Sequence, residues 1–188
     1  MPDKIILKKG EVLAFKTDTV WGFGADPDDN TAIENIYKIK HRDIKKPLIL
    51  MSYDIEPLKK YVKNIPDYAL ELIEKYLPGG LTLIFKKTEL VSDLITPYDT
   101  VGIRIPDSVD FIELTKKIKG GVLATTSCNI SSEPPVKNYL EAKEKFSECA
   151  TVIKPVILPE KETENIPSTV ILCDNNDYKI LRQGVIKL

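Results

Sequence analysis

Five segments of this chain place hydroxyl, amide, glycine and basic residues where they could bind a polar ligand. The first is residues 16–24, KTDTVWGFG, in which two threonines and two glycines would let backbone N–H groups approach a ligand closely. A β-turn around a buried Trp21 explains the same residues equally well. The segment is not a Rossmann fingerprint, because the third glycine is missing, and the chain has no GxxxxGK(S/T) phosphate-binding loop.

The second segment, residues 38–46, is rich in lysine and arginine and lies at the expected C-terminus of a helix. The helix dipole favours cations there, which alone can explain a basic cluster. The functional interpretation is that Lys40 and Arg42 converge on phosphates, the arginine by bidentate contact and the lysine as a point charge. The only histidine, His41, lies between these cations. That environment suits an anion site better than the neutral base of a Ser-His-Asp triad.

The other three segments are also ambiguous when each is taken alone. Arg104 interrupts an otherwise apolar strand at residues 100–106, where it needs an anionic partner, either a structural salt bridge or a bound carboxylate. Residues 124–131, ATTSCNIS, suit either a polar ligand or a Ser/Thr-rich turn at the end of a strand. The fifth segment has two parts, residues 167–170 and 181–184, and each could be an ordinary strand edge.

The composition limits the classes of function. The 188 residues are 43% hydrophobic and 29% charged, which suits one folded domain with a sizeable core. A formal net charge of -1 excludes a globally basic nucleic-acid binder but allows a local basic pocket. The three cysteines have no metal-ligand spacing, which favours reduced thiols in a cytoplasm over a disulfide framework. An apolar run at residues 5–7 is too short for a signal peptide, and we expect no membrane span.

Strand-like and helix-like segments alternate along the chain and predict the elements that must position these residues. The pattern indicates one α/β domain over residues 1–188, with a twisted mixed sheet flanked by helices. Strands are expected at residues 11–15, 48–51, 81–85, 100–105, 122–125, 151–153, 169–173 and 178–181. Helices are expected at residues 31–40, 55–62, 67–76, 111–118 and 139–146.

Three local features complete this expectation. Residues 16–28 are expected to form a loop after the first strand. Thr31 and Glu34 have the spacing of a capping box at the start of the first helix. Residues 155–167, rich in proline and glutamate, are the best candidate for a mobile loop.

In chain order, the segments together resemble the threonylcarbamoyl-AMP synthase family, whose domain has the YrdC-like, double-stranded-RNA-binding-like fold. Residues 17–24 are similar to the family's T-(D/E)-T-V-Y-G-L-G, residues 40–42 to its K-x-R and residues 127–129 to its S-x-N. Four further stretches align with the sequence pattern of the family, namely residues 78–82, 101–106, 168–170 and 181–184. The resemblance therefore covers nearly the whole chain.

The resemblance implies an enzyme, a nucleotidyltransferase that acts as an L-threonylcarbamoyladenylate synthase. It would form threonylcarbamoyl-AMP and pyrophosphate from L-threonine, bicarbonate and ATP, with Mg²⁺ accompanying ATP. A separate threonylcarbamoyl-transferase system would then modify tRNA to N6-threonylcarbamoyladenosine. Such a reaction needs a polyanion held in line with a nucleophile and does not need a histidine triad.

The resemblance also implies roles for particular residues, with no metal-ligating residue among them. The implied catalytic residues are Lys40, Arg42, Ser127 and Asn129. The implied ATP-binding residues are those four together with Lys46, Thr126 and Arg182. The implied threonine-binding residues are Thr17, Thr19, Trp21, Arg104 and Ser168, with Arg104 pairing with the amino acid carboxylate.

The chain departs from the family pattern at several positions. Lys16 stands where proline is usual, Trp21 where tyrosine is usual, and Ser132 where glycine is usual. Met51 occupies a position that is often histidine, which bears on one threonine contact. Longer relatives carry a C-terminal domain over the active site, and we expect this chain to lack it.

Two alternatives stay open, and the first belongs to another class of function. One is an RNA-binding module with the same fold, which the net charge of -1 opposes because backbone binding needs a broad cationic face. The other is a paralogue that acts on a different carbamoyl substrate, such as the carbamoyl-transferring domain of hydrogenase maturation proteins. The presence of both K-x-R and S-x-N favours the threonine enzyme.

Overall fold

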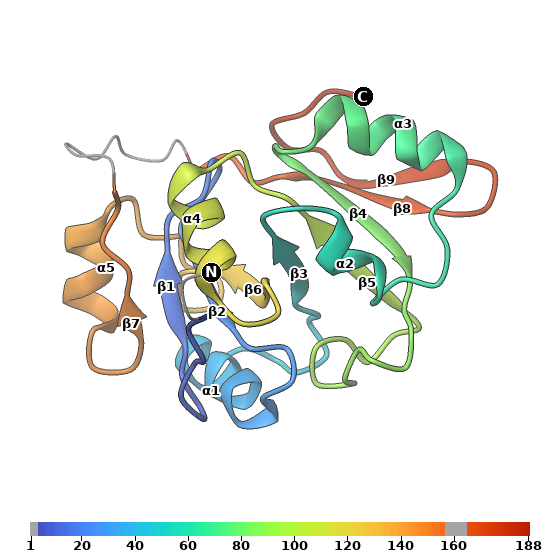
Figure 1. The fold of residues 1–188 in the computed structure, drawn as a ribbon. Coiled ribbons are helices and arrows are strands. Elements are labelled where there is room, and N and C mark those ends of the chain that lie inside the picture. Colours follow the sequence, from blue (N-terminus) through green and yellow to red (C-terminus); the bar gives the residue numbers. More distant parts are fainter. Residues whose placement is uncertain (1–3, 157–164) are drawn as a thin grey trace.

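The strands of this protein form one mixed sheet with helices packed against both faces, as the sequence predicts (Figure 1). The structure is a computed structural model, and it describes residues 4–156 and 165–188. Within these residues the sheet has nine strands in the order β7-β1-β2-β6-β3-β5-β4-β8-β9. The strands are β1 (Leu13–Phe15), β2 (Gly22–Ala25), β3 (Ile49–Ser52), β4 (Leu81–Lys86), β5 (Thr100–Arg104), β6 (Val122–Ser127), β7 (Thr151–Val152), β8 (Thr169–Cys173) and β9 (Tyr178–Arg182).

Both pairing modes occur in the sheet. The β1–β7, β3–β5 and β4–β8 pairs are parallel, whereas the other five pairs are antiparallel. Figure 1 shows α5 beside β7 at one end of the sheet and α3 beside β8 and β9 at the other. The helices are α1 (Asn30–Lys40), α2 (Glu56–Lys59), α3 (Asp67–Tyr76), α4 (Val109–Lys117) and α5 (Tyr139–Phe146).

The two faces of the sheet are covered unequally. On one face, apolar residues of α1, α2, α3 and α5 share a core cluster with strand residues such as Leu50 and Ile103. On the other face, Phe111 of α4 packs with Phe15 and Leu123 in a smaller cluster. Successive strand residues point to opposite faces, so the residues that alternate with the main core face the same side as α4. The part of that face beyond the α4 cluster carries the polar residues described below.

The main departure from the expected elements is β2, which lies within residues expected to form a loop. Gly22 and Gly24 resemble loop residues in the sequence, yet β2 pairs with β1 on one side and with β6 on the other. A Cβ atom at Gly24 would lie 2.7 Å from the Phe15 ring. Glycine is therefore required here by close packing within a central strand.

Two further local expectations are corrected. The N-cap of α1 is Asp29, whose side chain accepts a hydrogen bond from Ala32 N at 3.1 Å, and not the expected box of Thr31 and Glu34. Helix α2 ends at Lys59 and not at the expected Val62, which instead forms an isolated antiparallel bridge with Lys87, the residue after β4. Most of the expected mobile loop, residues 157–164, lies outside the described residues. Within the described chain, none of the helices has the length and apolar character needed to cross a bilayer.

Candidate functional site

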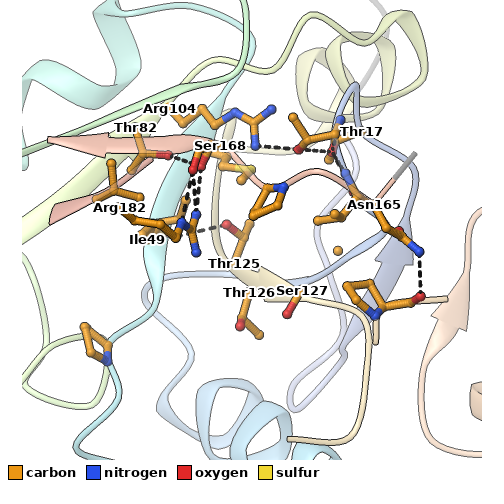
Figure 2. A pocket seen from close by; sticks show the side chains of 18 of the residues that line it. Thr17, Ile49, Thr82, Arg104, Thr125, Thr126, Ser127, Asn165, Ser168 and Arg182 are labelled. Carbon is orange, nitrogen blue, oxygen red and sulfur yellow. Dashed lines mark hydrogen bonds between the residues drawn. The ribbon is translucent and has the colours of Figure 1, made fainter. Parts of the chain in front are cut away.

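A cavity of about 320 Å³ lies against the sheet face that α4 leaves open (Figure 2). Its lining combines apolar side chains, among them Ile49 and Met51 of β3, with hydroxyl groups and arginines. Eight of the residues predicted for the site line it: Thr17, Thr19, Arg42, Arg104, Thr126, Ser127, Ser168 and Arg182. The structure therefore brings all five sequence segments to one place.

The pleat of the strands explains why these residues meet. In β5, Val101 and Ile103 point into the main core, so Gly102 and Arg104 face the cavity side. Met51 is the register partner of Arg104 on the neighbouring strand β3. A Cβ atom at Gly102 would lie 2.8 Å from Ile49 Cγ2, so glycine keeps the two strands closely packed beside the cavity.

Arg104 is buried, with 2% of its side chain exposed, and its guanidinium is held from three directions. Its Nη2 donates to Asp18 Oδ1 at 2.5 Å, its Nη1 to Thr19 Oγ1 at 2.9 Å and its Nε to Gly79 O at 2.9 Å. Burial lowers the pKa of Arg104, and the Asp18 carboxylate opposes that shift. The structural salt bridge expected from the sequence is thus present, and the same guanidinium lines the cavity.

A second arginine approaches the same end of the cavity from β9. Arg182 donates from Nη2 to Ser168 O at 2.9 Å and to Ser168 Oγ at 3.1 Å. Ser168 Oγ lies 2.8 Å from Thr82 Oγ1, and Figure 2 shows these three side chains pointing toward one another. Burial and then the neighbouring charge of Arg104 lower the pKa of Arg182. Two guanidinium groups and two buried hydroxyls therefore converge here.

Arg42 reaches the cavity from the C-terminus of α1. His41 ends that helix in the left-handed conformation, with φ 49°, and Arg42 N donates to Tyr37 O at 3.0 Å. The Arg42 guanidinium donates to the carbonyls of Lys46 and Pro47 at 3.2 and 3.1 Å. Burial lowers the pKa of Arg42. The described residues lining the cavity include three arginines and no acidic residue, so the cavity is suited to an anionic ligand.

The K-x-R and S-x-N residues divide into two groups. Arg42 and Ser127 line the cavity, whereas Lys40 and Asn129 lie beneath it, with 0% and 8% exposed. Lys40 Nζ donates to Ser127 O, Asn129 O and Asn129 Oδ1 at 2.5, 2.8 and 3.0 Å. Burial, followed by the charge of Arg42, lowers the pKa of Lys40 to about 8.

Two other predicted site residues also lie away from the cavity lining. Trp21 is fully buried in the main core cluster. Lys46 is exposed, and its backbone carbonyl accepts from Arg42. Their roles in ligand binding, like those of the other site residues, remain predictions.

Several lining residues were missed by the sequence reasoning. Thr82 alternates with the buried Leu81 and Leu83 in β4, and this alternation is a signal that could have placed it on the cavity side. Asn165 is the first residue of the second described range, residues 165–188. It lines the cavity, and its Nδ2 donates a hydrogen bond to Pro135 O at 3.2 Å. No sequence pattern points to Asn165 or Pro135, because both lie in irregular backbone.

Comparison with known proteins gives consistent relatives. The model of the Sua5/YciO/YrdC family, described as "Telomere recombination", matches residues 5–184. The threonylcarbamoyl-AMP synthase of Pyrococcus abyssi is 34% identical over 97% of this chain, and this chain spans about half of that protein, 53% of its length. That of Klebsiella pneumoniae is 31% identical over 79% of each chain. The crystal structure of P. abyssi Sua5 complexed with L-threonine has a TM-score of 0.81 and 33% identity, over 93% of this chain and 51% of that one.

Proposed function

The chain belongs to the Sua5/YciO/YrdC family, and we propose on this basis that it is a threonylcarbamoyl-AMP synthase. Its substrates would be L-threonine, bicarbonate and ATP. The threonine amine would bond to the carbon of bicarbonate, with loss of water, and give a carbamate. A carbamate oxygen would then attack the α-phosphorus of ATP, and the bond to the departing pyrophosphate would break.

The observation that carries this proposal is the convergence of three arginines and several hydroxyl groups on one cavity. The reaction joins an amino acid carboxylate, a carbamate and a triphosphate, which are all anionic. Arginine binds carboxylates and phosphates with paired N–H donors and stabilises charge that develops on phosphate oxygens. A cavity lined partly by apolar residues also limits water around the reacting groups.

The positions of the arginines suggest how the substrates divide the cavity. Arg104, with Thr17, Thr19 and Ser168, would hold threonine, and Arg104 would meet its carboxylate. Arg42, from the other side, would contact the phosphates. Ser127 and Thr126 would contact the phosphates as well, and Arg182 would help from the Arg104 end of the cavity. This arrangement would bring the carbamate oxygen and the α-phosphorus together between the two groups.

Other parts of the proposal concern components that act with the chain. We expect Mg²⁺ to enter with ATP, coordinated by phosphate oxygens and water. The adenylate would pass to a separate transferase system that modifies tRNA. That role, together with unpaired cysteines, fits a protein of the cytoplasm.

Pyrophosphate release tests the proposed activity. The purified chain is incubated with ATP, Mg²⁺, bicarbonate and L-threonine, and each of the four is omitted in turn. We expect pyrophosphate only in the complete mixture. Release that continues without threonine or bicarbonate would indicate simple ATP hydrolysis and contradict the synthase. ATP binding without any release would point to a paralogue with another acceptor.

A further inference from the structure

The charged ammonium group of Lys40 is buried and forms its hydrogen bonds with other groups of the protein. Its side chain is fully buried, and an ammonium group has three N–H donors. Those three donors have three protein acceptors, namely Ser127 O, Asn129 O and Asn129 Oδ1. No donor remains for a phosphate oxygen, and Lys40 is absent from the described cavity lining.

The hydrogen-bonding groups of Asn129 are equally occupied. Its Nδ2 donates to Ile130 O at 2.7 Å and to Glu133 O at 2.8 Å. Its Oδ1 accepts from Lys40 Nζ and, at 2.5 Å, from Ser127 Oγ. Asn129 therefore links Lys40 to the one S-x-N side chain that lines the cavity.

The same loop is tied to its surroundings by backbone hydrogen bonds. Ser131 N donates to Lys40 O, and Cys128 N donates to Trp21 O, both at 2.8 Å. Helix α1 and the segment before β2 thus hold the loop that follows β6. The carbonyls of Ser127 and Asn129 point to the Lys40 ammonium, so their partial negative charges are neutralised beneath the site.

We propose that Lys40 and Asn129 are positioning residues, which hold the loop after β6 so that Ser127 presents its hydroxyl to the ligand. Arg42 and Ser127 make the direct contacts. The Ser127 hydroxyl, whose one proton is donated to Asn129 Oδ1, would turn that proton to a ligand anion, and the two carbonyls that would repel the anion are directed toward Lys40. This assignment rests on the proposed function only in naming the ligand as ATP.

A double-mutant cycle separates positioning from direct contact. Lys40→Met is expected to lower kcat/KM for ATP on the order of 10²-fold, because small displacements of a reacting geometry are costly. If Lys40 acts through Ser127, the double variant with Ser127→Ala is no worse than the poorer single variant. Independent phosphate contacts would instead multiply, so losses that combine multiplicatively would overturn the proposal.

Two matched variants sharpen the cycle. Lys40→Arg keeps the charge but cannot place three N–H groups on the same three acceptors. We expect it to be nearly as impaired as Lys40→Met, whereas a residue needed only for its charge would be rescued. Lys38→Met, on the same helix and with 71% of the lysine side chain exposed, is the control and should behave as wild type.

Hydrogen exchange without ligand provides a test that does not depend on catalysis. Amides of residues 127–131 should exchange at least about tenfold faster in Lys40→Met and in Asn129→Leu. They should be unchanged in Arg42→Ala and in Lys38→Met. Unchanged exchange in Lys40→Met would overturn the proposal even if the wild type is an active synthase. If exchange is faster in Lys40→Met but the wild type proves inactive as a synthase, the proposed function is contradicted and the positioning role stands.

Discussion

Arg104 shows why a residue type alone could not settle its role. An arginine within an apolar strand requires an anionic partner, and the structure supplies Asp18 while leaving the guanidinium on the cavity wall. The structure confirms the salt bridge, and the bound-carboxylate role stays a prediction that the position of the guanidinium allows. What the sequence could not provide is the distance from β5 to the loop before β2, which the fold alone determines.

If Arg104 pairs with the amino acid carboxylate, its replacement should affect one substrate. Charge-assisted hydrogen bonds contribute about 1.5–3 kcal/mol, so Arg104→Lys should raise KM for threonine on the order of 10–100-fold. KM for ATP should change much less. Steady-state kinetics with each substrate varied in turn measure both values. Equal effects on the two substrates, or an unchanged threonine dependence, would refute the carboxylate role.

Arg42 is proposed to act on the phosphates, and its removal should slow the chemical step. Loss of one charged contact to the reacting phosphate should lower kcat on the order of 10²–10³-fold. The fold should survive, because the Arg42 side chain is only partly buried and donates to two loop carbonyls. The check is single-turnover kinetics of Arg42→Ala together with its thermal unfolding. Near-normal turnover would remove Arg42 from the site.

Lys40 should give the protein a distinctive pH response. Its pKa is about 8 in the folded protein, against 10.5 for an ordinary lysine. Between these values the unfolded chain binds the proton and the folded chain does not, so this group makes unfolding harder as pH rises. Below the folded pKa the cost of burying the charge is present in full. Wild type should therefore gain stability relative to Lys40→Met above about pH 8, by up to about 1.4 kcal/mol per pH unit.

The activity of the enzyme should fall over the pH range in which its stability rises. Above about pH 8 the neutral amine has lost one of its three N–H donors, so the loop after β6 is held less firmly. Denaturant unfolding and kcat/KM, both measured across this range, provide the comparison. Parallel stability curves for wild type and Lys40→Met would contradict the expected pKa.

The elements were predictable where their apolar pattern was regular. Helices α3 and α5 and strand β8 begin and end where the spacing of apolar residues indicates. Strand β2 was not predictable, because two of its four residues are glycines selected by contacts with another strand. Such contacts depend on tertiary packing, which local sequence patterns do not contain.

The packing of β2 against β1 leads to a stability prediction. In Gly24→Ala the new methyl group would lie 2.7 Å from Phe15 Cε1, so the ring must move within the core cluster under α4. We expect a loss of about 1–3 kcal/mol in the free energy of unfolding. Phe15→Leu in the same chain should recover part of that loss, which a double-mutant cycle by denaturant unfolding would measure. Additive effects would show that the contact is not responsible.

At the scale of the whole molecule, a chain of nearly zero net charge gathers three arginines at one cavity, one of them ion-paired with Asp18. The formal net charge is -1, yet three arginines from α1's end, β5 and β9 line one cavity. The resemblance identified the segments that carry these residues. It did not predict which side chains reach the cavity and which support it from below. That division depends on the depth of Lys40 and Asn129, and burial of single polar residues follows only from the assembled fold.

The most direct measurement is the identity of the product. The chain is incubated with ATP, Mg²⁺, L-threonine and ¹³C-bicarbonate, and the nucleotides are analysed by mass spectrometry. The account predicts an adenylate that contains threonine and the labelled carbon, formed in equal amount to pyrophosphate. An adenylate without the label, or threonyl-adenylate in its place, would contradict the proposed carbamate chemistry and with it the central claim.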